Sequence, residues 1–209
     1  MLNNGFVKNY FFNKKKFNKN IVKTKKVFKS FKSDLNNFKV PLFKSYEKDY
    51  NLDFSPTLIR KFYRFKNIII IGMGGSILGS KSIYSFLGSK IKKKVFFFDN
   101  LDLNLNLQFN KIKNLKNSCF IIVSKSGNTL ETLTNLGIIS SRIISKRNLI
   151  IITEIKDSSL VNVANKYGAK LIEHKAEISG RYSVFSEVGM LPAALMGLNI
   201  KKFINLKKL

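Results

Sequence analysis

The chain has 209 residues, of which 44% are hydrophobic and 12% aromatic, and its formal net charge at pH 7 is +26. This length and apolar content exclude a wholly disordered chain and allow one sizeable α/β core. Lys or Asn interrupts every run of Ile and Phe before it reaches the roughly 20 apolar residues that a membrane-spanning helix needs. We therefore expect no span and no membrane partner.

The positive charge is carried by lysines that are spread along the whole chain among many Asn, Ile and Phe residues. A surface that binds nucleic acid specifically usually gathers its cations on one face. We therefore interpret the charge as a consequence of AT-rich codons and expect no specific nucleic-acid partner. Nonspecific binding at low salt would follow from the charge alone, through counterion release.

The only cysteine, Cys119, lies inside the apolar run that ends at Val123. No His or cation neighbours it in sequence, so the pattern favours a buried, inert thiol over a nucleophile. One cysteine cannot build a disulfide framework, and the basic start of the chain lacks the apolar stretch and cleavage site of a secretory signal. We expect a cytoplasmic protein without a targeting peptide.

Residues 1–65 form the first predicted region, a basic segment rich in Lys and Asn with scattered aromatic residues. Pro41 and Pro56 divide it into short pieces. We predict short helices here, packed on a core that forms later in the chain.

Residues 66–200 contain five apolar runs separated by stretches with helical spacing. The runs are Ile68–Ile71, Val95–Phe98, Phe120–Val123, Leu149–Ile152 and, more weakly, Ala169–Ile172. Continuous apolar runs indicate strands that are buried on both faces. The predicted fold class is α/β: a three-layer αβα sandwich with a mostly parallel five-stranded sheet, preceded by a short helical N-terminal segment. Such sheets bind ligands beyond the carboxyl ends of their strands, so the turns that follow the strands are the candidate sites.

The turn after the first strand reads Gly72-Met-Gly-Gly-Ser-Ile-Leu-Gly79. Its glycines let backbone N–H groups approach a ligand, and the next helix presents its positive N-terminus, which suggests an anionic or hydroxyl-rich ligand. Two nucleotide motifs fail here, because Ile77 replaces the third glycine of a dinucleotide fingerprint and Ser80 replaces the P-loop lysine. Asp99 only superficially resembles a ribose-binding acid, and Lys81 comes one place late for a P-loop.

The turn after the third strand, Ser124-Lys-Ser-Gly-Asn-Thr-Leu-Glu-Thr132, is the strongest local signal in the chain. It places three hydroxyls, a lysine and a glycine directly before a predicted helix. Hydroxyls, amides and the helix dipole can therefore converge on a phosphate. Asn128 followed by Glu131 also fits a capping arrangement, which is the alternative role for those two residues.

A third turn, Ser179-Gly-Arg-Tyr-Ser183, precedes a helix in which Pro192 is expected within the first turns. Arg181 follows a glycine in a chain where nearly every cation is Lys, and arginine offers a planar fork of donors. The alternative for Arg181 is an ordinary surface ion pair.

Three segments, Gly72 to Gly79, Ser124 to Thr132 and Ser179 to Ser186, closely resemble the motifs of glucose-6-phosphate isomerases in content, order and separation. The resemblance covers roughly residues 66–199, the sugar-isomerase (SIS) domain of that family. It implies an aldose–ketose isomerase that converts glucose 6-phosphate reversibly to fructose 6-phosphate in glycolysis and gluconeogenesis. The implied reaction passes through a cis-enediolate and uses no metal or other cofactor. The implied partner is a hexose 6-phosphate, and the full-length enzyme is expected to be a homodimer.

The resemblance also implies roles for individual residues. Gly75 and Ser76 would lie beside the sugar, and Arg181 would stabilise negative charge on the enediolate. The residues expected to hold the phosphate are Ser124, Lys125, Ser126 and Thr129.

Members of this family draw their catalytic glutamate, and the histidine and lysine that open the sugar ring, from the second half of the chain. Residues 201–209 look like the start of a missing carboxyl-terminal region, so we expect a fragment with little activity alone. The only histidine, His174, does not match the ring-opening residue and is expected to be structural or exposed. None of the nearby acids lies at the position of the base; these are Glu131, Glu154, Glu173, Glu177 and Glu187. Two smaller departures from the family pattern are Ser179, where glycine is usual, and Glu187, where proline is common.

Two other functions stay open at this point. SIS domains also serve as noncatalytic phosphosugar sensors in regulators, although no recognisable DNA-binding helix pair precedes the domain here. The third class is a basic nucleic-acid-binding protein.

Overall fold

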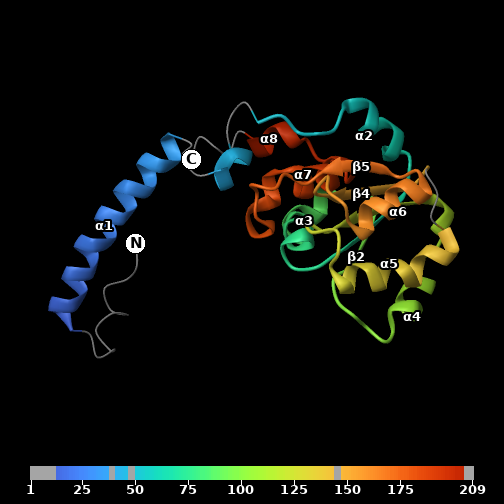
Figure 1. Ribbon diagram of the computed structural model, residues 1–209, viewed down its shortest axis with the longest axis horizontal. Helices are drawn as coiled ribbons and strands as arrows, with labels where there is room; N and C mark the ends of the chain where they lie inside the picture. Colours follow the sequence, from blue (N-terminus) through green and yellow to red (C-terminus); the bar gives the residue numbers. More distant parts are fainter. Residues whose placement is uncertain (1–12, 38–40, 47–49, 144–146, 205–209) are drawn as a thin grey trace. The chain divides into compact units, whose positions relative to one another are not determined.

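The computed structural model describes residues 13–37, 41–46, 50–143 and 147–204 (Figure 1). The chain divides into two compact units, Met1–Pro41 and Leu42–Leu209, and the domain limits expected from the sequence stay a prediction. The first unit contains the helix α1, Lys14–Asn36. Within residues 1–65, where short helices were expected, α1 is a long helix of 23 residues, and the short helices η1 (Pro41–Tyr46) and α2 (Pro56–Tyr63) follow it.

The second unit is built on a five-stranded sheet in the order β2-β1-β3-β4-β5, in which every pairing is parallel. The strands are β1 (Asn67–Gly72), β2 (Lys94–Phe98), β3 (Ser118–Val123), β4 (Leu149–Thr153) and β5 (Lys170–Glu173). All five match the predicted apolar runs to within two residues at each end. The chain order reverses beside β1, which makes the gap between β1 and β3 the topological switch point of the sheet.

Alternate residues of each central strand enter two separate cores. In β1, Ile68 and Ile70 belong to one core and Ile69 and Ile71 to the other, and all four are buried. Fully burying an isoleucine side chain stabilises the fold by about 2 kcal/mol. The continuous apolar runs are therefore explained by helices on both faces, and the predicted three-layer αβα fold is confirmed.

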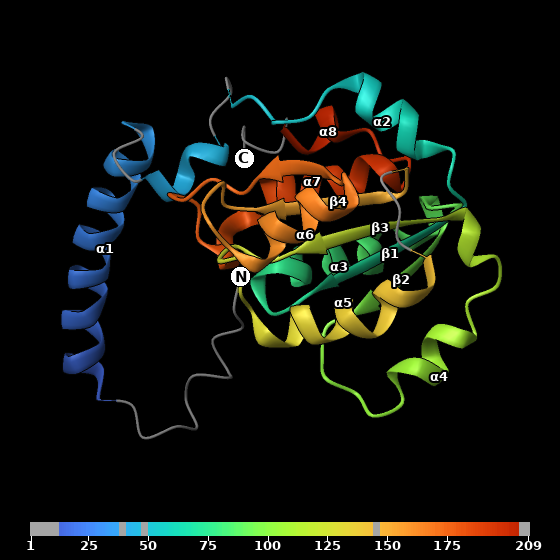
Figure 2. The ribbon, with the colours of Figure 1, turned by 45° about the vertical axis from the view of Figure 1, so that its right-hand side comes forward.

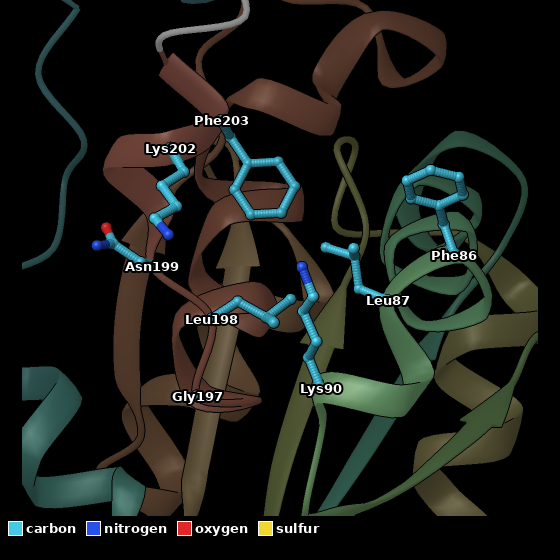
Figure 3. A pocket seen from close by; sticks show the side chains of 8 residues that line it. All are labelled: Phe86, Leu87, Lys90, Gly197, Leu198, Asn199, Lys202 and Phe203. Atoms are coloured by element: carbon cyan, nitrogen blue, oxygen red, sulfur yellow. The ribbon is translucent and has the colours of Figure 1, made fainter.

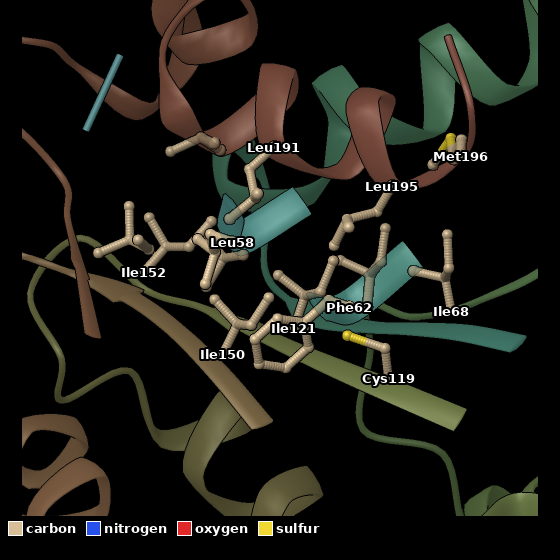
Figure 4. Close-up of a cluster of buried hydrophobic side chains, with 14 of the residues drawn as sticks. Leu58, Phe62, Ile68, Cys119, Ile121, Ile150, Ile152, Leu191, Leu195 and Met196 are labelled. Atoms are coloured by element: carbon tan, nitrogen blue, oxygen red, sulfur yellow. The ribbon is translucent and has the colours of Figure 1, made fainter. Parts of the chain in front are cut away.

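Helices cover both faces of the sheet (Figure 2). The first core is closed by α2 (Pro56–Tyr63), α3 (Gly75–Leu87) and α7 (Glu187–Leu195), as Figure 4 shows for part of it. The second core is closed by α4 (Leu105–Asn110), α5 (Leu130–Ile143) and α6 (Ser159–Tyr167). Short helical segments complete the unit: η1 (Pro41–Tyr46), η2 (Gly88–Lys90), η3 (Leu115–Asn117), η4 (Gly180–Phe185) and α8 (Ile200–Ile204).

Cys119 lies in the first core with no exposed surface. Burial raises the pKa of its thiol far above the usual range, so the reactive thiolate is disfavoured. The prediction of a buried, inert thiol is confirmed.

The helix α7 contains Pro192 in its second turn. A proline cannot donate to the carbonyl four residues earlier, which here is that of Val188. The Ser80 hydroxyl of α3 donates to this buried carbonyl at 3.2 Å and replaces the missing backbone bond. The contact also ties α3 to α7, the two helices that begin at the first and third candidate turns.

None of the helices in the described part of the chain combines the length and apolar character that a membrane crossing requires.

Candidate functional site

The turn from β1 into α3 holds its backbone in a conformation that only glycine adopts easily. Gly74, the N-cap of α3, has φ 51° and ψ −124°. No atom lies within 4 Å of where its side chain would be, so this end of α3 faces open space. The described turn therefore leaves the N-terminus of a 13-residue helix accessible to an anion.

The same turn meets the third turn backbone to backbone. A methyl group on Gly75 would lie 2.3 Å from the carbonyl carbon of Gly180 and 2.7 Å from the amide nitrogen of Arg181. The Ser183 hydroxyl donates to the Gly180 carbonyl at 2.7 Å and lies 3.4 Å from that of Gly75. Two turns that are more than one hundred residues apart in sequence are thus locked together, with Arg181 beside the start of α3.

A hollow of about 150 Å³ opens at this junction. Its walls come from both turns and from the first helical turns behind them: Gly75, Leu78, Gly79, Gly180, Arg181 and Val184. The Arg181 side chain is exposed, and among the described residues no carboxylate forms an ion pair with it. The described contacts thus do not favour the surface ion pair that was the alternative role for Arg181.

The second turn leaves β3, the strand next to β1. Gly72 and Val123, the last residues of the two strands, are register partners, so both turns start at the same end of the sheet. The Ser124 hydroxyl is buried and lies 2.8 Å from the Thr129 hydroxyl, which closes the turn just before α5 begins. Two hydroxyls and a helix N-terminus therefore meet within one short segment.

Two further polar side chains of the second turn, Lys125 and Ser126, already have protein partners. The Lys125 amine donates to the Ala176 carbonyl at 2.5 Å and lies 3.7 Å from the Glu154 carboxylate. The exposed Ser126 hydroxyl accepts from the Asn128 amide at 3.2 Å. The cation of Lys125 is thus close to the turn but is partly neutralised by an acid.

Asn128 does not cap the helix that follows it. Its side-chain oxygen accepts from the amide of Ser159 at 2.8 Å, which is the first residue of α6. The predicted capping role within α5 is wrong for Asn128, because the residue joins the second turn to the next helix of the sheet. Gly127 has φ 71°, and a methyl group there would lie 2.3 Å from the Ser158 hydroxyl, so the two segments touch closely.

Lys81 and Asp99, the two residues that partly resemble nucleotide-binding motifs, form an ion pair with each other. The Lys81 amine lies 2.5 Å from the Asp99 carboxylate. This ion pair links α3 to the end of β2 and gives both residues a structural partner.

His174 is buried with 1% of its surface exposed, at the end of β5. Its amide donates to the Thr153 carbonyl, and burial is the main cause that lowers the pKa of the imidazole. Its Nδ1 lies 3.2 Å from the Lys175 carbonyl. Of the two expectations for this residue, structural or exposed, the structural one is confirmed.

Glu187 is a buried carboxylate that the sequence did not single out as a structural residue. It is the first residue of α7 and has no exposed surface. The Tyr50 hydroxyl donates to it at 2.7 Å and the Asp53 amide at 2.9 Å. Burial, followed by the bond to Glu187, raises the pKa of Tyr50 above its usual range. Ser186 is the N-cap of α7 and accepts a hydrogen bond from the Val188 amide. A capping serine marks the start of a helix, where an acid is favoured, so Ser186 was the sequence signal for the structural role of Glu187.

A second and larger hollow of about 400 Å³ lies at the far end of α3 and α7 (Figure 3). Its walls are mainly apolar: Phe86, Leu87, Lys90, Gly197, Leu198, Asn199, Lys202 and Phe203. It shares no residue with the hollow beside Arg181. Within the described ranges, no group of three or more His, Cys, Asp or Glu side chains is arranged to hold a metal ion.

The fold and the site together define a class: a doubly wound parallel α/β protein whose glycine-rich and hydroxyl-bearing turns gather at the β1/β3 switch point, where such folds bind phosphorylated ligands. The profile of the phosphoglucose isomerase family matches residues 59–207. The chain belongs to that family, and the resemblance found in its motifs is confirmed.

The chain is 38% identical over 144 residues to the glucose-6-phosphate isomerase of Methanocaldococcus jannaschii, a match that covers 67% of this chain and 35% of that protein. Its fold is similar to the crystal structure of a hypothetical protein from Thermus thermophilus, with a TM-score of 0.65 and 24% identity over 79% of this chain and 41% of that one. It is also similar to a glucose-6-phosphate isomerase from Chlamydia trachomatis, with a TM-score of 0.61 and 22% identity over 80% of this chain and 36% of that one. The chain spans about a third of the length of the curated relatives it matches.

Proposed function

We propose that this chain supplies the phosphosugar-binding part of a glucose-6-phosphate isomerase, which interconverts glucose 6-phosphate and fructose 6-phosphate through a cis-enediolate. The observation that carries the proposal is the pair of hydroxyls, Ser124 and Thr129, 2.8 Å apart at the start of α5. Membership of the phosphoglucose isomerase family supports it. Glycolysis and gluconeogenesis are the pathways that follow from this reaction.

The proposed phosphate position lies over the second turn. There the hydroxyls of Ser124, Ser126 and Thr129 would donate hydrogen bonds to the phosphate, and the N-terminus of α5 would stabilise its negative charge. Lys125 would contribute a positive charge close to the phosphate, balanced in part by Glu154. Each hydrogen bond to a charged oxygen would contribute about 1.5–3 kcal/mol.

The proposed sugar position lies between this turn and the junction of the other two. Gly75 and Ser76 would lie beside the sugar, because the open N-terminus of α3 starts there. Arg181 would face the reacting carbons and stabilise the enediolate charge, as a fixed donor that needs no reorganisation. No metal or organic cofactor is part of the proposal.

Proton transfer between the two sugar carbons needs a base that none of the matched motifs supplies. In this proposal the chain binds the phosphosugar, and the 209 residues alone turn it over slowly or not at all. General acid–base assistance typically contributes about 10²- to 10⁴-fold, so its loss would be large. Turnover by the chain alone at the rate of a full-length isomerase would contradict this part of the proposal.

Thermal unfolding in the presence of three compounds tests the binding part. We expect 6-phosphogluconate to raise the melting temperature most, inorganic phosphate less, and gluconate, which has no phosphate, least. Equal shifts with gluconate and 6-phosphogluconate would show that the phosphate position is wrong.

The full-length protein is proposed to be a homodimer in the cytoplasm. Each of the parallel strands is followed in sequence by an exposed apolar residue, and these are Leu78, Leu103, Leu130, Ile155 and Tyr182. Exposed apolar groups that gather at one end of a sheet favour a protein partner there. Sedimentation of the full-length protein as a monomer at micromolar concentration would contradict the dimer.

A further inference from the structure

The helix α1 carries a face and a charge that the phosphosugar site does not use. Phe17, Ile21, Thr24, Phe28 and Phe31 recur every three or four residues, so they lie along one side of the helix. We call this side the aromatic stripe. An amphipathic helix of this kind is stable at a boundary between an apolar medium and a polar one.

The opposite side of α1 is strongly cationic. The helix contains nine lysines and one acid, Asp34. Lys15, Lys19 and Lys26 lie at the centre of the side opposite the aromatic stripe. Codon bias can explain many lysines, but it does not explain why the aromatic residues share one side of the helix.

Most of the apolar residues of α1 whose burial is described are exposed, and Ile21 is half-buried. Phe28 has 62% of its surface exposed and Val27, which lies beside the stripe, has 68%. Three lysines, at positions 14–16, occupy the first turn, where the helix dipole disfavours cations. An anionic surface against the helix would offset this repulsion and cover the stripe at the same time.

We propose that α1 binds the surface of a membrane that contains anionic lipids, with its axis in the plane of the membrane. The stripe would enter the boundary between headgroups and acyl chains, and the lysines would contact lipid phosphates and carboxylates. The helix is about 34 Å long and carries lysines along its whole length, so it would lie along the surface and not cross the membrane. The proposal replaces the expectation of no membrane partner, and it is independent of the function proposed for the sheet.

A nucleic acid is the other polyanion that nine lysines could bind. Phosphate contacts would use the cationic side only, and would leave Phe28 and Val27 in water. The aromatic stripe therefore favours the membrane over the nucleic acid.

Co-sedimentation of the 209-residue chain with vesicles tests the proposal. We expect binding to vesicles made of equal parts phosphatidylcholine and phosphatidylserine, and weak or no binding to phosphatidylcholine alone. No sedimentation with anionic vesicles would overturn the proposal.

Three variants separate the stripe from the charge. Phe28→Asp should weaken binding about tenfold or more, because it removes an exposed ring that the membrane would bury. The pair Lys19→Glu and Lys26→Glu should weaken it by at least about twentyfold, since each surface lysine contributes about fivefold. The matched control is Lys111→Glu with Lys116→Glu, two exposed lysines of the second unit, which changes the net charge equally and should leave binding nearly unchanged.

Two results would overturn the proposal even if vesicles bind. An unchanged affinity of the Phe28→Asp variant for the vesicles would mean that the lysines alone bind the membrane and that the aromatic stripe takes no part. A single-stranded oligonucleotide that binds at physiological salt and displaces the protein from vesicles would identify nucleic acid as the partner. The melting temperature of each variant shows whether the second unit is still folded.

Discussion

The turn after β1 and the turn after β3 lie at the same end of the sheet but are built in opposite ways. The first turn has no room for a side chain at Gly75, which meets Gly180 through backbone atoms alone. The second turn depends on side chains, because the Ser124 and Thr129 hydroxyls close it. The first therefore fixes the position of Arg181, while the second offers groups that a ligand can use. Changes in the first turn should affect folding, and changes in the second should affect binding.

The largest effect is expected for Gly75→Ala. Its new methyl group would overlap the Gly180 carbonyl carbon at 2.3 Å, and backbone cannot move aside as a flexible side chain can. We expect a loss of about 3 kcal/mol in the free energy of unfolding, measured with urea.

The matched control is Gly137→Ala in α5, where no atom lies within 4 Å of the added methyl group. A helical glycine replaced by alanine should stabilise the protein by about 0.5–1 kcal/mol. Similar stabilities for the Gly75 and Gly137 variants would show that the backbone contact does not hold the first turn.

A smaller loss of about 2 kcal/mol is expected for Glu187→Gln. The carboxylate accepts from two donors in a fully buried place, and an amide would direct a donor group at one of them. Urea unfolding measures the loss, and Tyr50→Phe should reproduce part of it. A Gln variant as stable as the parent chain would mean that the buried acid does not anchor the start of α7.

The smallest expected effect is a pH dependence due to His174, the only histidine of the chain. Burial lowers the pKa of His174 in the folded protein below 6.5, so the unfolded chain binds a proton more readily. The associated stability is complete above pH 6.5 and is lost as the pH falls through the lowered value. The slope is at most about 1.4 kcal/mol per pH unit.

Urea unfolding at pH 7.5 and pH 5.5 measures this dependence. His174→Gln should flatten it over that interval, because Glu154 and Glu177, whose pKa values lie below the usual 4.5, titrate only at lower pH. Equal losses in the parent chain and the variant would assign the effect to other groups.

The sheet could be predicted from the sequence because each strand is one continuous apolar run. The helix α5 was predicted directly after the second turn, and 70% of its first residue, Leu130, is exposed because the helix begins there at the open end of the sheet. Local patterns thus predicted the elements, whereas the exposure of a residue at the end of an element depends on the tertiary structure.

The contacts between distant segments could not be predicted from local pattern. Gly75 and Gly180 each signalled a turn, but their contact depends on the packing of α3 against η4 and α7. Asn128 matched a local cap and instead binds the amide of Ser159, thirty-one residues away in sequence. Motif order suggested that the three turns share one site, and only the tertiary structure shows which atoms meet.

The claim that a single phosphosugar lies between the second turn and Arg181 is tested most directly by calorimetric titration. The ligands are 6-phosphogluconate and inorganic phosphate, and the proteins are the parent chain, Ser124→Ala and Arg181→Ala. We expect Ser124→Ala to weaken the binding of both ligands about tenfold or more, because it removes a serine hydroxyl that would donate a hydrogen bond to the phosphate. Arg181→Ala should weaken the binding of 6-phosphogluconate and leave the affinity for inorganic phosphate unchanged. Unchanged affinity of 6-phosphogluconate for either variant would contradict the claim.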